Sequence, residues 1–565
     1  MTSTALTAPA AGQGRTLRTI LLALSTLLML TLVGLPVLAI LLYALFPHIN
    51  EWSLAAPFSA LLPNLLNPHL IGAILNSLAL ALGVTLLAGL IALPLAFRRA
   101  QMGARLGRLW DALLLIPILI PPYIGALSWM QLLQVNGFSD QLLGFNLAGF
   151  LYSFPGIVSV MALHLFPLIY FASAKAFAVI GSRYGDVARV FGGSPLQIFI
   201  RIHLPMILPT LLSSGLIVFV LTLEEFGTPE ILGSRFGFRV IVTAIHEKFS
   251  DWPIDLPGAS VLSMILILLA FLAYQLHQRC AHRFRTAVEN QNLSTPARAT
   301  PRLQQLCDLL LFGSAVTLAV LLPLASVTLS ALMDTLSGGL SPDNLSLHHL
   351  GALFERESAA WEAISTSLTL ALLAALGSVA IAVLVAFTLV RLRTRGTALL
   401  DFLSILPNAI PGMAIAVGLI LTWNQAFWPI TPYNSPAILL VAYICLTLPY
   451  PIRMLTAALQ QLPRSLDDAA YISGASELRV IVRILTPLLA PVALAAGCIV
   501  FAIASRELVS SLMLAPAGVE TVATYVFHQF DQGSINAGMA MSLVTLLVSG
   551  AIIVLGQRLP GGQVR

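Results

Sequence analysis

The chain has 565 residues, of which 58% are hydrophobic and only 9% are charged, and its mean hydropathy is +0.92. Soluble globular proteins carry about 25% charged residues, so this composition excludes a soluble globular protein. Many apolar runs reach about twenty residues, the length that crosses ~30 Å of hydrocarbon. The sequence therefore predicts an all-α membrane protein embedded in a lipid bilayer. The net charge of +5 does not indicate nucleic-acid binding, because the basic residues stand in short segments between the apolar runs.

The apolar runs predict twelve transmembrane helices, six in each half of the chain. Residues 1–14 are rich in Ala and Thr and are expected to be disordered. The first repeat, 15–280, has runs near 17–46, 70–97, 112–133, 149–175, 206–225 and 258–278. A polar linker is expected at 281–304. The second repeat, 305–565, has runs near 306–332, 363–390, 398–421, 435–457, 488–512 and 536–556.

The two halves are similar in single residues. Ser77 and Pro121 recur 290 positions later as Ser367 and Pro411. A longer set recurs 282 positions later, beginning with Pro167 and Pro449 and ending with Glu225 and Glu507. Because a six-span unit keeps its orientation when it is duplicated, we expect a pseudo-twofold axis along the membrane normal between the repeats.

The arginines predict the orientation of the chain in the membrane. They concentrate at both ends, in the linker and in the segments 182–204 and 464–486, all on one side of the predicted spans. Since Lys and Arg are enriched in cytoplasmic loops, we expect both termini and these segments to be cytoplasmic.

One polar segment occurs twice and is here called the glycine-hinged loop. Each copy predicts two short helices around a glycine that suits a left-handed residue after a helix end. Ser182 and Ser465 are expected to cap the first helix, and Ser194-Pro195 to start the second. In the first copy, at 182–204, the matching residues are Asp186, Val187, Ala188, Gly192, Ile202 and Pro205. In the second copy, at 464–486, they are Asp468, Ala469, Ala470 and Gly474, followed by Ile484 and, directly after the loop, Pro487.

This pattern resembles the EAA loop of ABC importer permeases, the cytoplasmic segment that docks on the ATPase subunit. The departures are Val187 at the second motif position and Asp in place of Glu at the first. The alternative is an ordinary amphipathic cytoplasmic hairpin, which would not require the same residues at the same offsets twice.

Over nearly its whole length the chain resembles the fused permeases of iron(III)-type ABC importers, and the Glu-Glu-Phe-Gly-Thr-Pro run at 224–229 adds to the resemblance. The resemblance implies the type I ABC importer permease fold in a bacterial inner membrane. It further implies two copies of a cytoplasmic ATPase, a periplasmic binding protein and ferric iron as solute. Relatives with the same layout carry aminoethylphosphonate, thiamine or polyamines, which remain alternatives.

The sequence contains no recognisable energy source or catalytic group of its own. Its two lysines, Lys175 and Lys248, lie outside any GxxxxGK[ST] phosphate loop, and there is no HExxH, GxSxG or Cys/His cluster. We therefore expect no enzyme activity and no cofactor in this chain, with ATP and Mg²⁺ on partner subunits. An ion-coupled secondary transporter is the rival class, but it would not need two docking loops.

Several polar residues are candidates for the substrate path. Charges at membrane depth are costly and usually face the bundle interior, a partner or water. Glu224, Glu225, Arg506 and Glu507 could line the path or an outer gate, or they could be interfacial charges, with Arg506 and Glu507 as a structural pair. Among the uncharged polar residues in or beside the third and ninth spans, Gln131 and Asn408 could line the path or bond across helices. Prolines such as Pro117, Pro121, Pro407 and Pro411 are expected to kink those spans.

Overall fold

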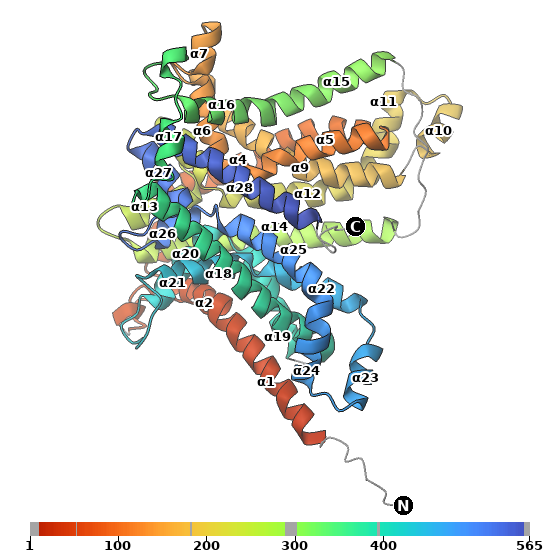
Figure 1. The fold of residues 1–565 in the computed structure, drawn as a ribbon, viewed down its shortest axis with the longest axis vertical. Helices are drawn as coiled ribbons and strands as arrows, with labels where there is room; N and C mark the ends of the chain where they lie inside the picture. The colour runs from red at the N-terminus through yellow and green to blue at the C-terminus, as the bar shows by residue number, and fades with distance from the viewer. Residues whose placement is uncertain (1–10, 52, 181–182, 289–301, 393–395, 559–565) are drawn as a thin grey trace, which may run out of the picture. The chain divides into compact units, whose positions relative to one another are not determined.

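The computed structural model describes residues 11–51, 53–180, 183–288, 302–392 and 396–558. Within these ranges the chain is helical, with one isolated β-bridge between Met333 and Leu345 (Figure 1). The all-α class predicted from the sequence is therefore confirmed.

Each predicted span corresponds to one continuous helical segment or to one bent pair of helices. Within the described residues, nine helical segments are long and apolar enough to cross a membrane, and up to twelve if each of three bent pairs is one span. In the first repeat these are α1–η1–α2 (Ala11–Met29, Leu30–Gly34, Leu35–Leu45), α4 (Pro68–Arg99), α5 (Ala104–Leu119) with α6 (Pro122–Leu133) and α7 (Phe138–Leu143), α9 (Phe154–Ile180), α11–η3–α12 (Pro195–Ile198, Phe199–His203, Leu204–Glu224) and α14 (Leu256–Val288). In the second repeat they are α15–η6–α16 (Arg302–Val316, Thr317–Leu321, Leu322–Leu332), α18–η8 (Ala359–Phe387, Thr388–Leu392), α19–η9 (Thr397–Ile405, Leu406–Ala409) with α20 (Gly412–Trp423), α21 (Pro436–Thr447) with α22 (Pro449–Gln461), α24–η10–α25 (Glu477–Val480, Ile481–Leu485, Thr486–Ala504) and α28 (Ile535–Arg558).

The third span of each repeat is broken rather than kinked. The bend between α5 and the following helices is 95°, and the bend between α19–η9 and α20 is 117°. Pro121 and Pro411 stand at these breaks in extended conformations, with ψ of 138° and 143°. Because proline has no backbone N–H and disfavours a helical residue before it, the helix stops and restarts. The predicted kinks lie at the right prolines, but the change of direction is larger than a kink.

Prolines also explain wide helical turns that recur in both repeats. The π-helical segments η1 and η6 precede Pro36 and Pro323, and η3 and η10 precede Pro205 and Pro487. A proline ring clashes with the carbonyl four residues earlier, and a turn with i→i+5 bonding relieves that clash. The equal placement of these turns is further evidence that the repeats share one fold.

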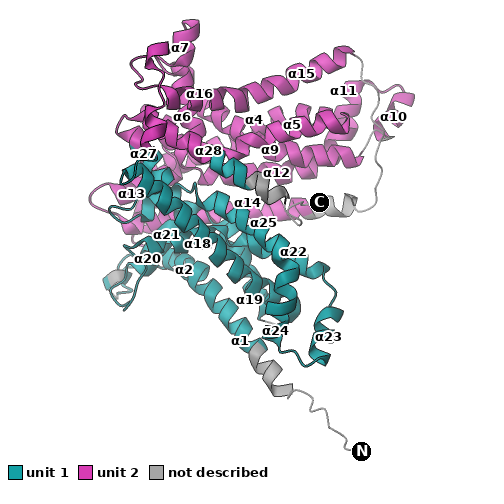
Figure 2. Ribbon diagram, in the orientation of Figure 1, with its two compact units in different colours: residues 1–57, 354–528, 547–565 teal, residues 58–353, 529–546 magenta. Residues whose placement is uncertain are grey.

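The chain divides into two compact units that differ from the sequence repeats (Figure 2). Unit 1 comprises 1–57, 354–528 and 547–565, and unit 2 comprises 58–353 and 529–546. Inside unit 1, α1 and α2 pack on α19 and α20, and inside unit 2, α15 and α16 pack on α4, α5 and α6. The first span of each repeat therefore belongs to the compact unit of the other repeat. The predicted boundaries at 15–280 and 305–565 describe the sequence repeat and not the packing.

Two predicted disordered or linking segments are partly helical. Helix α1 begins at Ala11, so residues 11–14 are helical, whereas residues 1–10 lie outside the described residues. Helix α14 continues to Val288 and α15 starts at Arg302, so only 289–301 of the expected linker lies outside the described residues. These polar residues continue the neighbouring long helices, because adding a residue to an existing helix costs less than nucleating a new helix.

Small buried residues let the central helix of each unit pack closely. Helix α4 packs on α9 and α12 within unit 2, and α18 packs on α22 and α25 within unit 1. Their buried faces are rich in alanine and serine, which allow close helix approach in membranes. The Ser77 hydroxyl accepts a hydrogen bond from the Ile241 N–H at 2.8 Å. Its repeat equivalent Ser367 accepts one from the Val522 N–H at 2.7 Å, so the repeat extends to single hydrogen bonds.

Candidate functional site

The first glycine-hinged loop has the predicted pair of short helices, α10 (Arg183–Val190) and α11. Gly192 between them has φ of +80°, the left-handed conformation predicted for it. Ser194 starts α11 with a capping box: its hydroxyl accepts from the Gln197 N–H at 3.3 Å, and the Gln197 side chain accepts from the Ser194 N–H at 3.1 Å. Ser182, the other predicted cap, lies outside the described residues.

The second glycine-hinged loop repeats this geometry with α23 (Ser465–Ile472) and α24. Gly474 has φ of +79°, and the Ser476 hydroxyl accepts from the Arg479 N–H at 3.4 Å at the start of α24. The prediction that Ser465 caps α23 is wrong. Ser465 is the first residue inside the helix, and Arg464 holds the capping position without a side-chain hydrogen bond.

Both loops expose apolar side chains beside the motif residues. The exposed fractions are 83% for Val190, 85% for Phe191 and 88% for Ile472. Asp186, whose side chain is 46% exposed, pairs with Arg189 at 3.2 Å, and Asp468 on the other loop is also exposed. An apolar surface next to a carboxylate at a helix start is suited to contact with another protein.

In both copies, some of the remaining motif residues are exposed and the others are half-buried or buried. Ala469, Gly192 and Gly474 are exposed, as are Val187 at 54%, Pro205 and Pro487. Ala188, Ile202 and Ile484 are half-buried, and Ala470 is buried. The motif therefore supplies an outer surface from the short helices and an anchor where each loop enters the following span.

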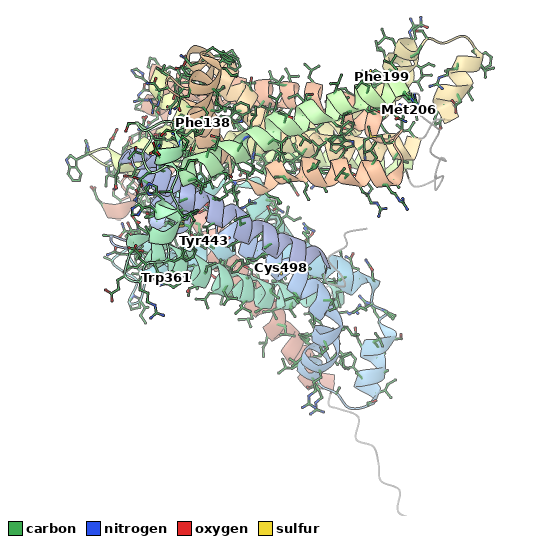
Figure 3. All side chains as sticks on the ribbon, turned by 45° about the horizontal axis from the view of Figure 1, so that its top comes forward. Phe138, Phe199, Met206, Trp361, Tyr443 and Cys498 are labelled. Atoms are coloured by element: carbon green, nitrogen blue, oxygen red, sulfur yellow. The ribbon has the colours of Figure 1, made fainter. Side chains whose placement is uncertain are left out.

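The two loops are attached to their units by different chemistry. At the base of the first loop, the Phe97 ring lies 5.1 Å from Phe199, 5.4 Å from Phe177 and 5.5 Å from the His203 ring (Figure 3 labels Phe199). At the base of the second loop, the Asp467 carboxylate lies 2.7 Å from the Arg391 guanidinium. Burial raises the pKa of the Asp467 carboxyl, and the Arg391 charge opposes that rise. Sequence reasoning missed these contacts.

The two candidate glutamates occupy equivalent positions after α12 and α25. Both carboxylate oxygens of Glu225 accept from the Thr228 N–H at 3.0 Å. The Glu507 carboxylate accepts from the N–H groups of Ser510 and Ser511, at 2.9 to 3.1 Å. Each carboxylate thus caps the start of the next helical turn. The sequence analysis had considered a structural role for these glutamates as the alternative to a role in the substrate path. Glu224 is the last residue of α12, and the backbone of Arg506 follows α25 directly before Glu507.

The predicted uncharged path residues do not occupy equivalent positions. Gln131 in α6 is buried and lines a cavity of about 240 Å³ in unit 2, together with Gln134 and Asn136. Asn408 lies in η9 at the break of its span and is exposed. Of these two residues, Gln131 is therefore the one that lines this cavity.

Unit 1 contains a larger cavity that sequence reasoning did not identify, with a volume of about 720 Å³. Glu362, Thr366 and Thr369 line one wall, and Glu520 and His528 form a pair at 2.9 Å on another. No group of three or more His, Cys, Asp or Glu that could hold a metal ion is found in the described part of the chain. Both cavities have polar lining residues, but the cavity in unit 1 is lined by a carboxylate and an ion pair, whereas the cavity in unit 2 is lined by amide side chains.

Comparison with known families decides the class of protein. The family model described as "Binding-protein-dependent transport system inner membrane component" matches residues 86–286 and again residues 364–560. The chain belongs to this family. Each match contains one glycine-hinged loop, so this transport-system permease carries two family domains in one chain, as its internal repeat predicts.

Two ferric transport permeases align with most of the length of this permease, and a third relative aligns with less than half of it. It is 26% identical over 498 residues to the ferric transport system permease protein FbpB of Actinobacillus pleuropneumoniae, covering 86% of this chain and 70% of that protein. It is 23% identical over 447 residues to the Fe(3+)-transport system permease protein FbpB 2 of Haemophilus influenzae, covering 78% and 80%. A permease of Salmonella typhimurium named PhnV, for 2-aminoethylphosphonate transport, is 27% identical over 229 residues, covering 40% and 84%.

The family places the permease in the inner membrane, where it works with an ATPase and a periplasmic binding protein. The apolar helices agree with that location. Its role is therefore the transmembrane component of an ABC importer.

Proposed function

We propose that this permease imports ferric iron, received from a periplasmic binding protein and driven by two copies of a cytoplasmic ATPase. The observation that carries the proposal is the duplicated glycine-hinged loop, with matching left-handed glycines and exposed apolar side chains in both copies. Two docking loops need two ATPase copies, one for each loop. ATP and Mg²⁺ are then bound by the ATPase, and this chain hydrolyses no nucleotide.

The membrane orientation follows from the same proposal. Both loops, both termini and the segment joining the repeats face the cytoplasm, since Lys and Arg concentrate there. The segments after α12 and α25, which carry Glu225 and Glu507, then face the periplasm. Solute therefore enters from the side of these carboxylates.

Two observations support ferric iron as the solute. Three relatives that align over 78–86% of the chain are named for ferric transport. Carboxylates such as Glu224, Glu225 and Glu507 are hard oxygen ligands, which favour a hard cation over an anion.

The test is reconstitution of the chain in proteoliposomes together with its ATPase and its binding protein. We expect ATP-dependent uptake of ferric iron, no uptake without the ATPase, and a stoichiometry of two ATPase subunits per chain. Uptake of 2-aminoethylphosphonate, thiamine or a polyamine instead of iron would show that ferric iron is the wrong solute, while the assignment as an ABC importer would stand. Uptake driven by a proton or sodium gradient without ATP would establish a secondary transporter.

A further inference from the structure

The helix before the glycine of the second loop is fixed to a membrane helix by buried charges. Arg391, at the end of the α18–η8 helix, lies with its Nε 2.7 Å from the Asp467 Oδ2, and their side chains are only 8% and 7% exposed. Arg391 also donates to the Leu462 carbonyl at 3.2 Å. Arg464, which directly precedes α23, in turn donates to the Val390 carbonyl of η8 at 3.0 Å. These contacts connect α18–η8 to α23 in both directions.

The helix after the glycine is fixed to a different membrane helix. Glu477, the first residue of α24, forms an ion pair with Arg18 of α1; the Glu477 side chain is only 5% exposed, whereas the Arg18 side chain is 54% exposed. The two partners are 459 positions apart in the sequence. In Figure 1, α24 lies next to the N-terminal half of α1, and both helices belong to unit 1. The short helices on both sides of Gly474 are therefore each attached to their own span.

Both partners are buried in Arg391–Asp467, and the glutamate alone is buried in Arg18–Glu477. Burying a charge in an ion pair is a poor way to gain stability, because the charge loses its hydration. Their better-attested use is to fix one register between two elements. Asp467 directly precedes Asp468, the first residue of the docking motif, so the position of Asp467 sets the position of that residue. Glu477 stands three residues after Gly474 and controls the opposite arm of the loop in the same way.

We propose that the pairs Arg391–Asp467 and Arg18–Glu477 are positioning pairs, which transmit movement between the docked second loop and the spans α18 and α1. This inference rests on the proposed function, since it requires an ATPase on the loop. When the loop moves, α1 and α18 move with it at the same time, because each ion pair connects one of the short helices beside Gly474 to one of these spans. Coupling through the second loop is thus ionic.

The first glycine-hinged loop lacks these pairs. Gly185 and Pro195 stand where the second loop has Asp467 and Glu477. A side-chain carbon on Gly185 would lie 3.4 Å from the His203 ring, so a close contact with the ring replaces the charged one. The two loops are therefore coupled by different contacts, and removal of a charge should affect only the second.

The experiment compares variants of the full chain, reconstituted with its ATPase and binding protein, by solute transported per ATP hydrolysed. For Asp467→Asn and Glu477→Gln we expect this ratio to fall about tenfold, a typical size for coupling between sites. The exchanged pair Arg391→Asp with Asp467→Arg should recover at least half of the loss of Asp467→Asn. ATPase binding, measured by co-purification, should change less than the ratio does, because the docking surface itself is intact.

The pair Arg98–Asp308 provides the matched control. Its Nε and Oδ1 atoms lie 2.6 Å apart, the side chains are 17% and 7% exposed, and it joins α4 to α15, with neither residue belonging to a glycine-hinged loop. Asp308→Asn should lower folded yield as Asp467→Asn does, yet keep the transport-to-hydrolysis ratio of the unmodified protein.

An unchanged ratio in both Asp467→Asn and Glu477→Gln overturns the inference, and so does an equal loss of the ratio in Asp308→Asn. If Asp467→Asn fails to fold, the exchanged pair and Glu477→Gln still decide the question. Failure of the unmodified chain to bind any ATPase would instead contradict the proposed function, before any variant is compared.

Discussion

Replacing Gly474 is the sharpest test of the docking geometry. Its φ of +79° is a conformation that residues with a side-chain β-carbon avoid. A β-carbon built there meets nothing within 4 Å, so a substitution strains the backbone and creates no clash. An alanine held in this conformation costs roughly 1–2 kcal/mol, and a β-branched residue costs more.

That strain has a defined effect on docking. The loop relieves it by leaving the left-handed conformation, which changes the angle between α23 and α24. A difference of 1–2 kcal/mol lowers the population of the docking geometry about 5- to 30-fold. We therefore expect Gly474→Ala to weaken ATPase binding by about that factor, Gly474→Val to weaken it further, and Gly474→Asn to stay nearest to the unmodified chain, because Asn tolerates this conformation.

The assay is the affinity of the purified permease for its ATPase in detergent, with thermal unfolding measured on the same samples. Gly313 in α15 provides a control, because a β-carbon there also meets nothing within 4 Å and its φ is not positive. Gly313→Val should leave the affinity unchanged. Equal affinities for Gly474→Val and Gly474→Asn would refute the argument that the left-handed hinge sets the docking surface.

Three further predictions concern partner and solute. Phe191→Ser and Ile472→Ser should each weaken ATPase binding by about 10- to 100-fold in the same assay, because burying such a side chain contributes about 1.5–3 kcal/mol; unchanged affinity in both would place the interface elsewhere. The purified chain alone should release no phosphate from ATP in a colorimetric assay, and hydrolysis at the rate of the full complex would contradict this. The double variant Glu225→Gln, Glu507→Gln should keep its fold, since the amide oxygen still accepts the capping N–H, but lose uptake of ferric iron more than ATP hydrolysis; unchanged uptake would leave both residues as caps only.

The spans and the hinged loops were predictable because their signals are local. A run of apolar residues marks a span, and a glycine with fixed neighbours marks a left-handed turn, whatever the rest of the chain does. The left-handed conformations of Gly192 and Gly474 and the helix start at Ser194-Pro195 are accordingly confirmed. The error at Ser465 is also local, since α23 starts one residue earlier than a cap at that serine requires.

The packing of the spans was not predictable from the same signals. A helix that is apolar on all sides does not show which neighbour it contacts, so the sequence repeat predicted boundaries that the compact units do not follow. The two ion pairs of the second loop were missed for a related reason. Arg18 and Glu477 are far apart in sequence, and each alone is indistinguishable from an ordinary charge at the end of a membrane helix.

The exchange of first spans and the ionic attachment of the second loop combine into one mechanical argument. Helix α1 belongs to the first repeat in sequence but packs within unit 1, where it reaches the second loop through Arg18 and Glu477. A displacement of that loop therefore acts directly on a span encoded by the other repeat. The first loop cannot form the equivalent pair, because Pro195 stands in place of the glutamate. Two loops with one docking geometry thus transmit force through different contacts, and a substitution at one of them need not have the same effect at the other.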